Sequence, residues 1–201
     1  MTAIPYLLKE LNTKRISICG ISEHWLLDNI LNSIGNNYRE STIPCANPAY
    51  TNCRYFGKGG VAIMWHKDLY YLVEIVDTYS DRIAAVRICC GSISILILQV
   101  YLPAANHDIS SFKSSVDQLG DICTVHTESN YILIISDFTA RFPRTDVTTH
   151  LRSRDMYDTE LAKSLHLYVA TDTVSCTGLP FTLYPYNDAN PSRIEHVLLD
   201  V

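Results

Sequence analysis

YILIISDFTAR, residues 131–141, is almost continuously apolar until it reaches a polar end. A run of this kind is typical of a strand that is buried on both faces, so it predicts a sheet with further layers on each side. Side chains two positions apart on a strand leave the same face. We therefore expect Asp137 and Thr139 to point together into a cleft where the strand opens into a loop.

Runs of apolar and β-branched residues on the amino-terminal side of this stretch predict more strands, separated by gaps of turn length. They are RISICGISEHW (15–25), GGVAIMWH (59–66), YLVEIV (71–76), RIAAVRICC (82–90) and ISILILQVYLP (93–103). Short connections of this kind are typical of antiparallel strands. SRIEHVLLDV (192–201) predicts a last strand after them.

Helical spacing of apolar residues is interleaved with these strands. It occurs at Tyr6 to Leu11, in 26–35, in 108–128 and around 158–168. In 108–128, Phe112, Val116, Leu119 and Cys123 mark one buried face, and Asp108 and Ser110 are candidates for the N-cap. Interleaved strands and helices predict an α/β (α+β) protein with a mixed sheet, and no repeat or linker divides residues 1–201 into more than one domain.

Composition places the chain in the ordinary globular class, because 47% of the residues are hydrophobic and only 18% are charged. The formal net charge of −5 does not favour a polyanion such as nucleic acid, so such a partner would need a local basic patch or bridging metal ions. The oligomeric state is open, and unpaired edge strands would make self-association a hypothesis to test.

The expected location is intracellular, the nucleus included. The longest apolar run, beginning at Ile93, ends before Gln99 and is far shorter than the roughly 20 residues of a membrane span, so no membrane contact is expected. The first residues carry no basic leader of the kind found in a signal peptide. The seven cysteines show no C-x-x-C spacing, which favours reduced thiols over a zinc or disulfide framework.

Four strands present a polar residue at one end: Glu23, Tyr101, Asp137 and Glu195. Carboxylates that converge from several strand ends are typical of a site for a divalent cation. Taken singly, each carboxylate is more often a solvated turn residue, and Tyr101 is equally consistent with a half-buried aromatic ring. His196 alternates with Glu195, so we expect it to pack on the opposite face or to meet water.

The order of the motifs is more specific than any one of them. SEHWL, GGVAI, VYLPA, DFTAR and SRIEHVLL, read in this order, resemble the endonuclease/exonuclease/phosphatase superfamily, and most of all the endonuclease domains of non-LTR retrotransposons. The resemblance runs from about Ile16 to the last residue. It implies a four-layer sandwich in which two mixed β-sheets pack face to face with helices outside, and a first strand and a final Ser-Asp-His segment that lie outside these 201 residues.

The resemblance also implies a reaction, the hydrolysis of a phosphodiester in DNA with Mg²⁺, or alternatively Mn²⁺, as the cofactor. Glu23 resembles the carboxylate that holds the metal, and Glu195 is the second predicted metal-binding carboxylate. Tyr101 resembles the residue that contacts the phosphate, and Asp137 the one that positions or deprotonates the attacking water. The remaining positions carried over from the family are Thr139 in the catalytic set, and Thr182 and Ser192 near the substrate.

Several departures from the family pattern oppose full activity. Ser136 replaces a glycine, Thr139 replaces an asparagine, and Glu195 replaces an aspartate, which lengthens the side chain by one bond of about 1.5 Å. None of the seven histidines lies in a Ser-Asp-His motif. We therefore expect a weak or inactive nuclease, and two alternatives stay open: a phosphoesterase for a small or lipid phosphate, and a binding module that keeps the fold without catalysis.

Overall fold

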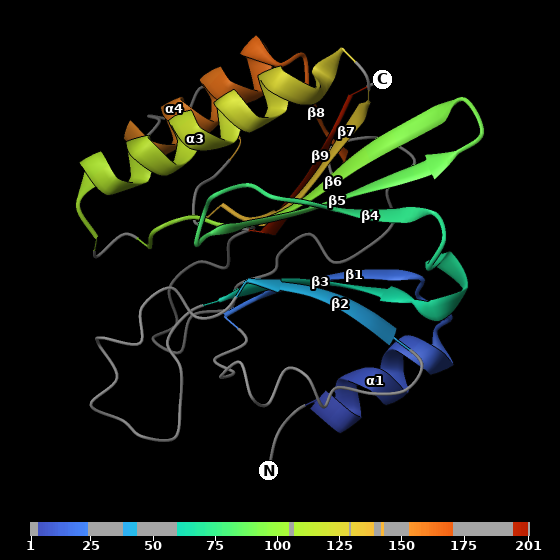
Figure 1. The fold of residues 1–201 in the computed structure, drawn as a ribbon. Coiled ribbons are helices and arrows are strands. Elements are labelled where there is room, and N and C mark those ends of the chain that lie inside the picture. Colours follow the sequence, from blue (N-terminus) through green and yellow to red (C-terminus); the bar gives the residue numbers. More distant parts are fainter. Residues whose placement is uncertain are drawn as a thin grey trace.

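The computed structural model describes residues 4–23, 38–43, 60–104, 107–128, 130–138, 142, 153–170 and 195–200. Two sheets pack face to face in this part of the chain, and helices cover the outer face of each sheet (Figure 1). The order of layers is one helix, a smaller sheet, a larger sheet and two helices. The expected α/β sandwich of four layers is therefore confirmed.

The smaller sheet has the strand order β1-β3-β2. Its strands are β1 (Ile18–Ser22), β2 (Tyr38–Ile43) and β3 (Val61–His66), and both pairs are antiparallel. Helix α1 (Ile4–Thr13) lies on the outer face of this sheet, where Leu11 packs against Met64. β2, whose sequence YRESTI has no apolar alternation, was not expected from the sequence. It forms a strand through its pairing with the buried strand β3.

The larger sheet has the order β4-β5-β6-β7-β9-β8. The strands are β4 (Val73–Val76), β5 (Ile83–Cys90), β6 (Ile93–Tyr101), β7 (Tyr131–Asp137), β8 (Tyr168–Val169) and β9 (Glu195–Leu199). β6 and β7 run parallel, and the other pairs are antiparallel. The mixed character thus belongs to this sheet, and it arises because helix α3 (Ile109–Thr127) carries the chain back between β6 and β7.

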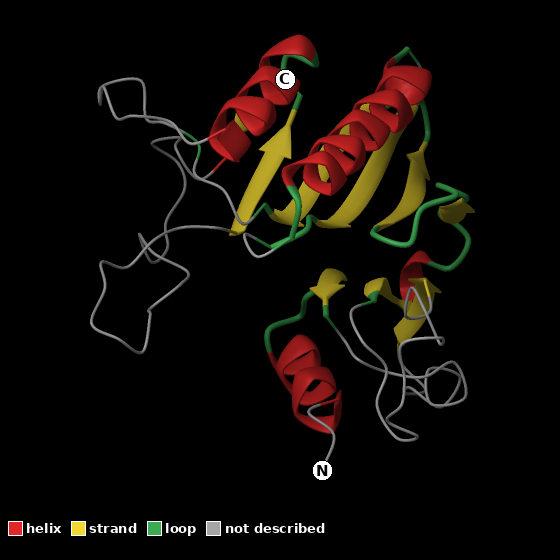
Figure 2. Cartoon of the chain, turned by 90° about the vertical axis from the view of Figure 1, so that its left-hand side faces the viewer, coloured by secondary structure: helices red, strands yellow, loops and turns green. Residues whose placement is uncertain are grey.

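Apolar side chains on alternate positions of the larger sheet supply two separate cores. One face, which includes Leu98 and Ile134, packs under α3 and α4 (Ser153–Ser164). The other face, which includes Val86 and Ile97, packs against β3 of the smaller sheet. Figure 2 shows the two sheets edge-on with the helices outside them. β7 contributes to both cores, as its continuous apolar sequence predicted.

Helix α3 has its buried face at Phe112, Val116, Leu119 and Cys123, as expected. Asp108 occupies the N-cap position, but its carboxylate accepts from the Ser110 hydroxyl and makes no capping bond to the backbone. Helix α4 begins earlier than the sequence indicated and ends at Ser164. It ends there because His166 adopts a left-handed φ of 55°, which turns the chain into β8.

No helix in the described ranges combines the length and the apolar character that a membrane crossing requires. The helix expected over 26–35 lies outside the described residues. A 3-10 turn, η2 (Lys67–Leu69), links β3 to the larger sheet.

Candidate functional site

Three of the predicted site positions lie side by side at one end of the larger sheet. Tyr101 and Asp137 are partners in the parallel pair β6–β7, and Asp137 is the partner of Glu195 in the antiparallel pair β7–β9. Because the carboxyl ends of β6 and β7 meet the amino end of β9, the three positions form a row across neighbouring strands. The sequence placed each residue at a strand end, and the register places them next to one another.

Glu23 reaches the same place from the smaller sheet. It follows β1 directly, and its carboxylate oxygen Oε1 accepts a hydrogen bond of 2.7 Å from the Tyr101 hydroxyl. Its φ of 53° lies in the left-handed region, which costs a residue with a side chain of order 1–3 kcal/mol and which persists only where the surroundings enforce it. The turn at Glu23 thus directs the carboxylate across the gap between the two sheets.

The Tyr101 hydroxyl lies in a negative environment. Its partial burial raises the pKa of Tyr101 well above the usual range, and the hydrogen bond to Glu23 and the charges of Glu23 and Asp137 raise it further. The Arg82 guanidinium, 5.8 Å from the centre of the Tyr101 ring, lowers that pKa by a smaller amount. Tyr101 is therefore a hydrogen-bond donor at any pH near neutrality, and two carboxylates flank it with one arginine as counter-charge.

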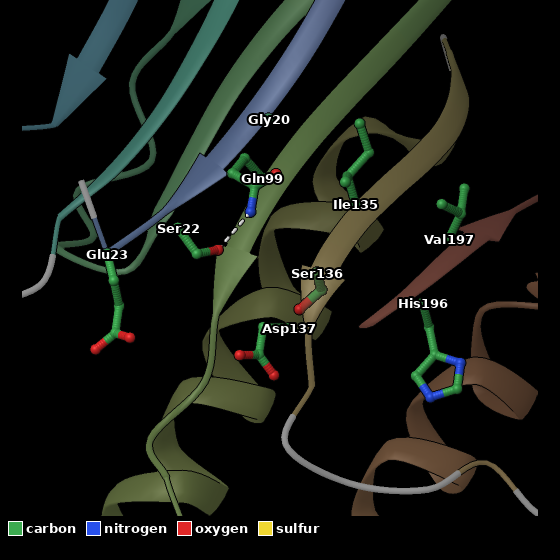
Figure 3. A pocket seen from close by; sticks show the side chains of 9 residues that line it. All are labelled: Gly20, Ser22, Glu23, Gln99, Ile135, Ser136, Asp137, His196 and Val197. Carbon is green, nitrogen blue, oxygen red and sulfur yellow. Dashed lines mark hydrogen bonds between the residues drawn. The ribbon is translucent and has the colours of Figure 1, made fainter. Parts of the chain in front are cut away.

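A cleft of about 480 Å³ opens beside these residues, between the end of β1 and the strands β6, β7 and β9. Its walls are formed by Gly20, Ser22, Glu23, Gln99, Ile135, Ser136, Asp137, His196 and Val197. Figure 3 shows the Glu23 side chain just beyond the end of β1 and the Asp137 side chain at the end of β7, and both line the cleft. Its volume lies in the range of pockets that bind small molecules, roughly 300–1,000 Å³.

Gln99 and Ser22 are members of this cleft that the sequence did not identify. The signal for Gln99 was available, because it interrupts an apolar strand two positions before Tyr101 and so shares its face. Ser22 gave no comparable signal. The two side chains are joined across the sheets by a hydrogen bond of 2.7 Å from Gln99 Nε2 to Ser22 Oγ (Figure 3).

Ser136, one of the departures from the family pattern, fits its position. It lies inside β7 between Val100 and His196, its φ is not in the left-handed region, and its hydroxyl donates to the Val100 carbonyl over 3.0 Å. The glycine that it replaces is therefore not required here for backbone conformation.

His196 packs inside the protein, which confirms one of the two expectations for it. Its ring is 5% exposed and lies edge-on to Phe142 at 4.9 Å and to Phe138 at 6.1 Å. Its register partner is Ser136, so it leaves β9 on the face opposite to Asp137. Among the described histidines, His196 is the one that borders the cleft, and its orientation separates it from the row of Tyr101, Asp137 and Glu195.

The donor set suits Mg²⁺ better than a metal held by a complete protein cage. Within the described residues, no group of three or more His, Cys, Asp or Glu side chains is arranged to hold an ion. Glu23 and Asp137 nevertheless both line the cleft. Proteins usually bind Mg²⁺ through one or two carboxylates, with water and substrate phosphates as the remaining ligands, and this pair matches that chemistry.

The other predicted site residues lie outside the described part of the chain. Thr139, Thr182 and Ser192 are among the residues that the structure does not describe, and so is the side chain of Glu195, although its backbone forms the first position of β9. Their predicted roles therefore stay predictions.

Comparisons with known proteins identify the fold. No family model and no curated protein matches the sequence. Many solved structures are similar, and the following three are among them. The endonuclease domain of TRAS1, a telomere-specific non-LTR retrotransposon, aligns with TM-score 0.66 and 14% identity over 99% of this chain and 80% of its own. The 3′ phosphatase NExo from Neisseria, bound to a product DNA hairpin, aligns with TM-score 0.68 and 15% identity over 98% and 81%. The catalytic domain of human Nocturnin with a bound sulfate aligns with TM-score 0.64 and 14% identity over 96% and 72%.

The chain therefore has the fold of the endonuclease/exonuclease/phosphatase superfamily, as its motifs predicted. At this level of identity the similarity concerns the fold alone. It does not distinguish a retrotransposon endonuclease from the other two proteins, because the three alignments have nearly equal scores.

Proposed function

We propose that residues 1–201 form a single Mg²⁺-dependent phosphodiesterase domain that nicks DNA slowly, in the manner of a retrotransposon endonuclease. The observation that carries the proposal is that Glu23 and Asp137, which come from different sheets, line one cleft, and that Tyr101, the strand partner of Asp137, donates a hydrogen bond to Glu23 beside it. A chance arrangement of solvated turn residues would not be expected to place a strained glutamate on the hydroxyl of a half-buried tyrosine.

Each of the three residues then has a distinct role. Glu23 and Asp137 supply the carboxylates for the ion, which when bound neutralises the charge that develops on the phosphate and the leaving oxygen. Asp137 also orients the attacking water and accepts its proton on a carboxylate oxygen. Tyr101 stays protonated because its pKa is raised, and its single O–H donor, which binds Glu23 in the absence of substrate, turns to a phosphate oxygen of the substrate.

The low rate follows from departures from the family pattern within residues 1–201. His196 leaves β9 on the face opposite to Asp137, so it does not act as a base there, and losing a catalytic base costs a factor of about 10² to 10⁴. Thr139 and Glu195 add two further departures, and an error of about 1 Å in the position of a reacting group can cost on the order of a hundredfold. The packed ring of His196 does not compensate for them.

A small phosphate ester is the second candidate substrate. The net charge of −5 weakens long-range attraction to DNA, and the cleft of about 480 Å³ has the size of a pocket for a small molecule. A DNA substrate requires steep salt dependence, since each phosphate contact releases counterions, whereas binding of a small ester depends much less on salt.

The first experiment is nicking of supercoiled plasmid at low salt, with Mg²⁺ or with EDTA. It compares the wild type with Asp137→Ala and with Asp121→Ala, which removes an exposed carboxylate from α3. Slow nicking that requires Mg²⁺, persists in Asp121→Ala and disappears in Asp137→Ala supports the proposal. Equal silence of all three folded proteins would reject the proposal of DNA nicking and leave the small-ester phosphoesterase and the binding module as the remaining functions.

A second experiment separates the two substrates. Duplex DNA and a chromogenic phosphodiester compete for the active protein at 50 and 200 mM salt. Inhibition by DNA that weakens steeply with salt supports a nuclease, and inhibition of DNA nicking by the small ester at both salt concentrations supports a small-molecule phosphoesterase.

A further inference from the structure

A buried polar bridge connects the two sheets directly behind the proposed site. Gln99 is 3% exposed and lies on the face of β6 that meets the smaller sheet, together with Ile97 and Tyr101. Its Nε2 donates to Ser22 Oγ over 2.7 Å and lies 3.5 Å from the Val100 carbonyl oxygen. Gln99 and Tyr101 thus reach from adjacent same-face positions of β6 to the adjacent residues Ser22 and Glu23.

Gly20 makes room for this bridge. A Cβ atom built on Gly20 would lie 1.7 Å from Gln99 Oε1, which is closer than any real contact. The amide of Gln99 therefore occupies the space that a side chain at position 20 would fill. β1 and β6 can approach each other here because Gly20 has no side chain, and the long side chain of Gln99 fills the space between the two strands.

The bridge is not explained by stability. Gln99 Oε1 is buried and has no hydrogen-bond partner among the residues that the structure describes, and burial of an unsatisfied amide oxygen is unfavourable. A methionine has a similar length and no polar atom to satisfy, so an apolar residue at this position of an apolar strand would be expected to fold at least as well. A role beyond folding is the remaining reason for a glutamine here.

We propose that Gln99 is a positioning residue, which holds Ser22 and thereby fixes the adjacent Glu23 carboxylate against the Tyr101 hydroxyl. Ser22 ends β1, and Glu23 follows it with a left-handed φ of 53°, so the orientation of the Glu23 side chain depends on where the end of β1 is held. The hydrogen bond from Gln99 to Ser22 holds that end, and the Tyr101 hydroxyl donates to the Glu23 carboxylate. This inference rests on the proposed function only in its claim that Glu23 is positioned to bind a metal ion. The hydrogen bonds from Gln99 to Ser22 and from Tyr101 to Glu23 are present without the ion.

The test uses a readout that needs neither metal nor substrate. The protein is labelled with ¹³Cζ-tyrosine, and the Tyr101 signal is assigned by its loss in Tyr101→Phe. Glu23→Ala gives the position of this signal when the hydrogen bond is absent. We expect the Tyr101 signals of Gln99→Met and Ser22→Ala to move most of the way to that position, and the signal of Ser22→Thr, which keeps the hydroxyl, to stay near the wild type.

Two further measurements separate positioning from folding. The melting temperature of Gln99→Met should be at least as high as that of the wild type. If Gln99 had only a structural role, the substitution would lower the melting temperature. Mn²⁺ affinity, followed by the electron paramagnetic resonance of the free ion, should fall on the order of ten- to a hundredfold in Gln99→Met and in Ser22→Ala. In a Glu23→Ala background the same two substitutions should change nothing, because the residue that they position is gone.

The outcomes distinguish this inference from the proposed function. If the Tyr101 signal of folded Gln99→Met and of folded Ser22→Ala equals that of the wild type, the positioning role is overturned, whatever the nicking assay shows. If the signal moves as expected while the wild type neither binds Mn²⁺ nor nicks plasmid, the bridge stands and the catalytic proposal fails. Gly20→Ala is the third probe of the bridge, since its Cβ would displace the Gln99 amide and should move the same signal.

Discussion

The Tyr101 hydroxyl donates a hydrogen bond of 2.7 Å to Glu23, a residue 78 positions earlier in the chain and on the other sheet. The contact joins the end of β1 to the end of β6, at the place where Asp137 ends the neighbouring strand β7. It is therefore a link between the two sheets as well as the centre of the proposed site.

Tyr101→Phe removes this donor and keeps the ring. We expect nicking to slow by about ten- to a hundredfold, since a hydrogen bond to a charged group contributes about 1.5–3 kcal/mol. The pKa of Tyr101 is raised, so the tyrosine does not titrate between pH 6 and 9, and the pH–rate profile of the variant should keep the shape of the wild-type profile. Rates measured across this range check both points. A profile that loses one limb in Tyr101→Phe would show that the tyrosine acts by transferring a proton.

Mg²⁺ should stabilise the wild type and should not stabilise Glu23→Ala. With a dissociation constant of about 1 mM, 10 mM Mg²⁺ would add about 1.4 kcal/mol, which raises the melting temperature of a chain of this size by roughly 3–6 °C. Scanning fluorimetry with and without Mg²⁺ measures the shift. Glu128→Ala, which removes an exposed carboxylate beyond the end of α3, is the matched control and should keep the full shift. Equal shifts in both variants would place the ion elsewhere.

The apolar patterns predicted which segments form strands, and they failed where a strand has no apolar pattern. β6 and β7 could be predicted as strands because their apolar side chains fill cores on both faces of the sheet. β2 was not, because YRESTI pairs with β3 without the alternation of a half-buried strand. The start of α4 was missed for a related reason, since its first turn contains Arg154 and Asp155, and its buried positions include aspartates.

The candidate site was predictable as a set of strand ends and unpredictable as a geometry. Tyr101 and Asp137 were identified by their positions after apolar runs, but only the register shows that they are partners in a parallel pair. The bridge between Gln99 and Ser22 depends on the approach of two sheets at Gly20, which is a long-range contact with no local signal. Family resemblance supplied the roles, and the sequence supplied the residues.

Ser136→Gly restores the residue of the family pattern and should not restore activity. Ser136 is buried in β7 without a left-handed φ, and its hydroxyl donates to the Val100 carbonyl. The substitution should lower the free energy of unfolding by about 1–2 kcal/mol, through the lost hydrogen bond and the entropy of glycine. Ser136→Ala, which loses the hydroxyl alone, should lose a smaller amount. Urea denaturation of the three proteins measures these differences, and faster nicking by Ser136→Gly would contradict the expectation.

Arg87 joins three elements on the side of the larger sheet away from the cleft. Its Nε donates to Asn130 Oδ1 over 3.1 Å, its Nη1 to Glu74 Oε2 over 2.8 Å, and its Nη2 lies 3.2 Å from His126 Nδ1. Arg87→Met should lower the free energy of unfolding by about 1–3 kcal/mol, because Asn130 is buried and loses a charged donor.

The exposed partner of Arg87 provides the control for that prediction. Glu74 is largely exposed, so Glu74→Gln should cost less than about 1 kcal/mol. Urea denaturation at two salt concentrations compares the variants. Equal losses in Arg87→Met and Glu74→Gln would show that the surface ion pair, and not the buried amide, accounts for the stabilisation.

Asp158 makes the stability of the protein depend on pH. It is fully buried in α4, and neither of its carboxylate oxygens has a hydrogen-bond partner among the described residues. Burial, and next the charge of Asp155, raises the pKa of Asp158 from 3.8 to about 8, while Arg154 lowers it. Between these two pH values the folded protein holds a proton that the unfolded chain has lost. The free energy of unfolding therefore falls as pH rises from about 4 to about 8, by up to about 1.4 kcal/mol per pH unit.

Asp158→Asn should remove this slope, because the amide has nearly the same shape and no charge. Urea denaturation at pH 5, 6, 7 and 8 should show the variant gaining stability relative to the wild type at each step, with the gain levelling off above pH 8. Asp117→Asn, at an exposed position of α3, should follow the wild-type curve. If the wild type and Asp158→Asn show parallel curves over this range, the Asp158 carboxyl is already charged in the folded protein at pH 5, and a positive group that holds it must lie against α4.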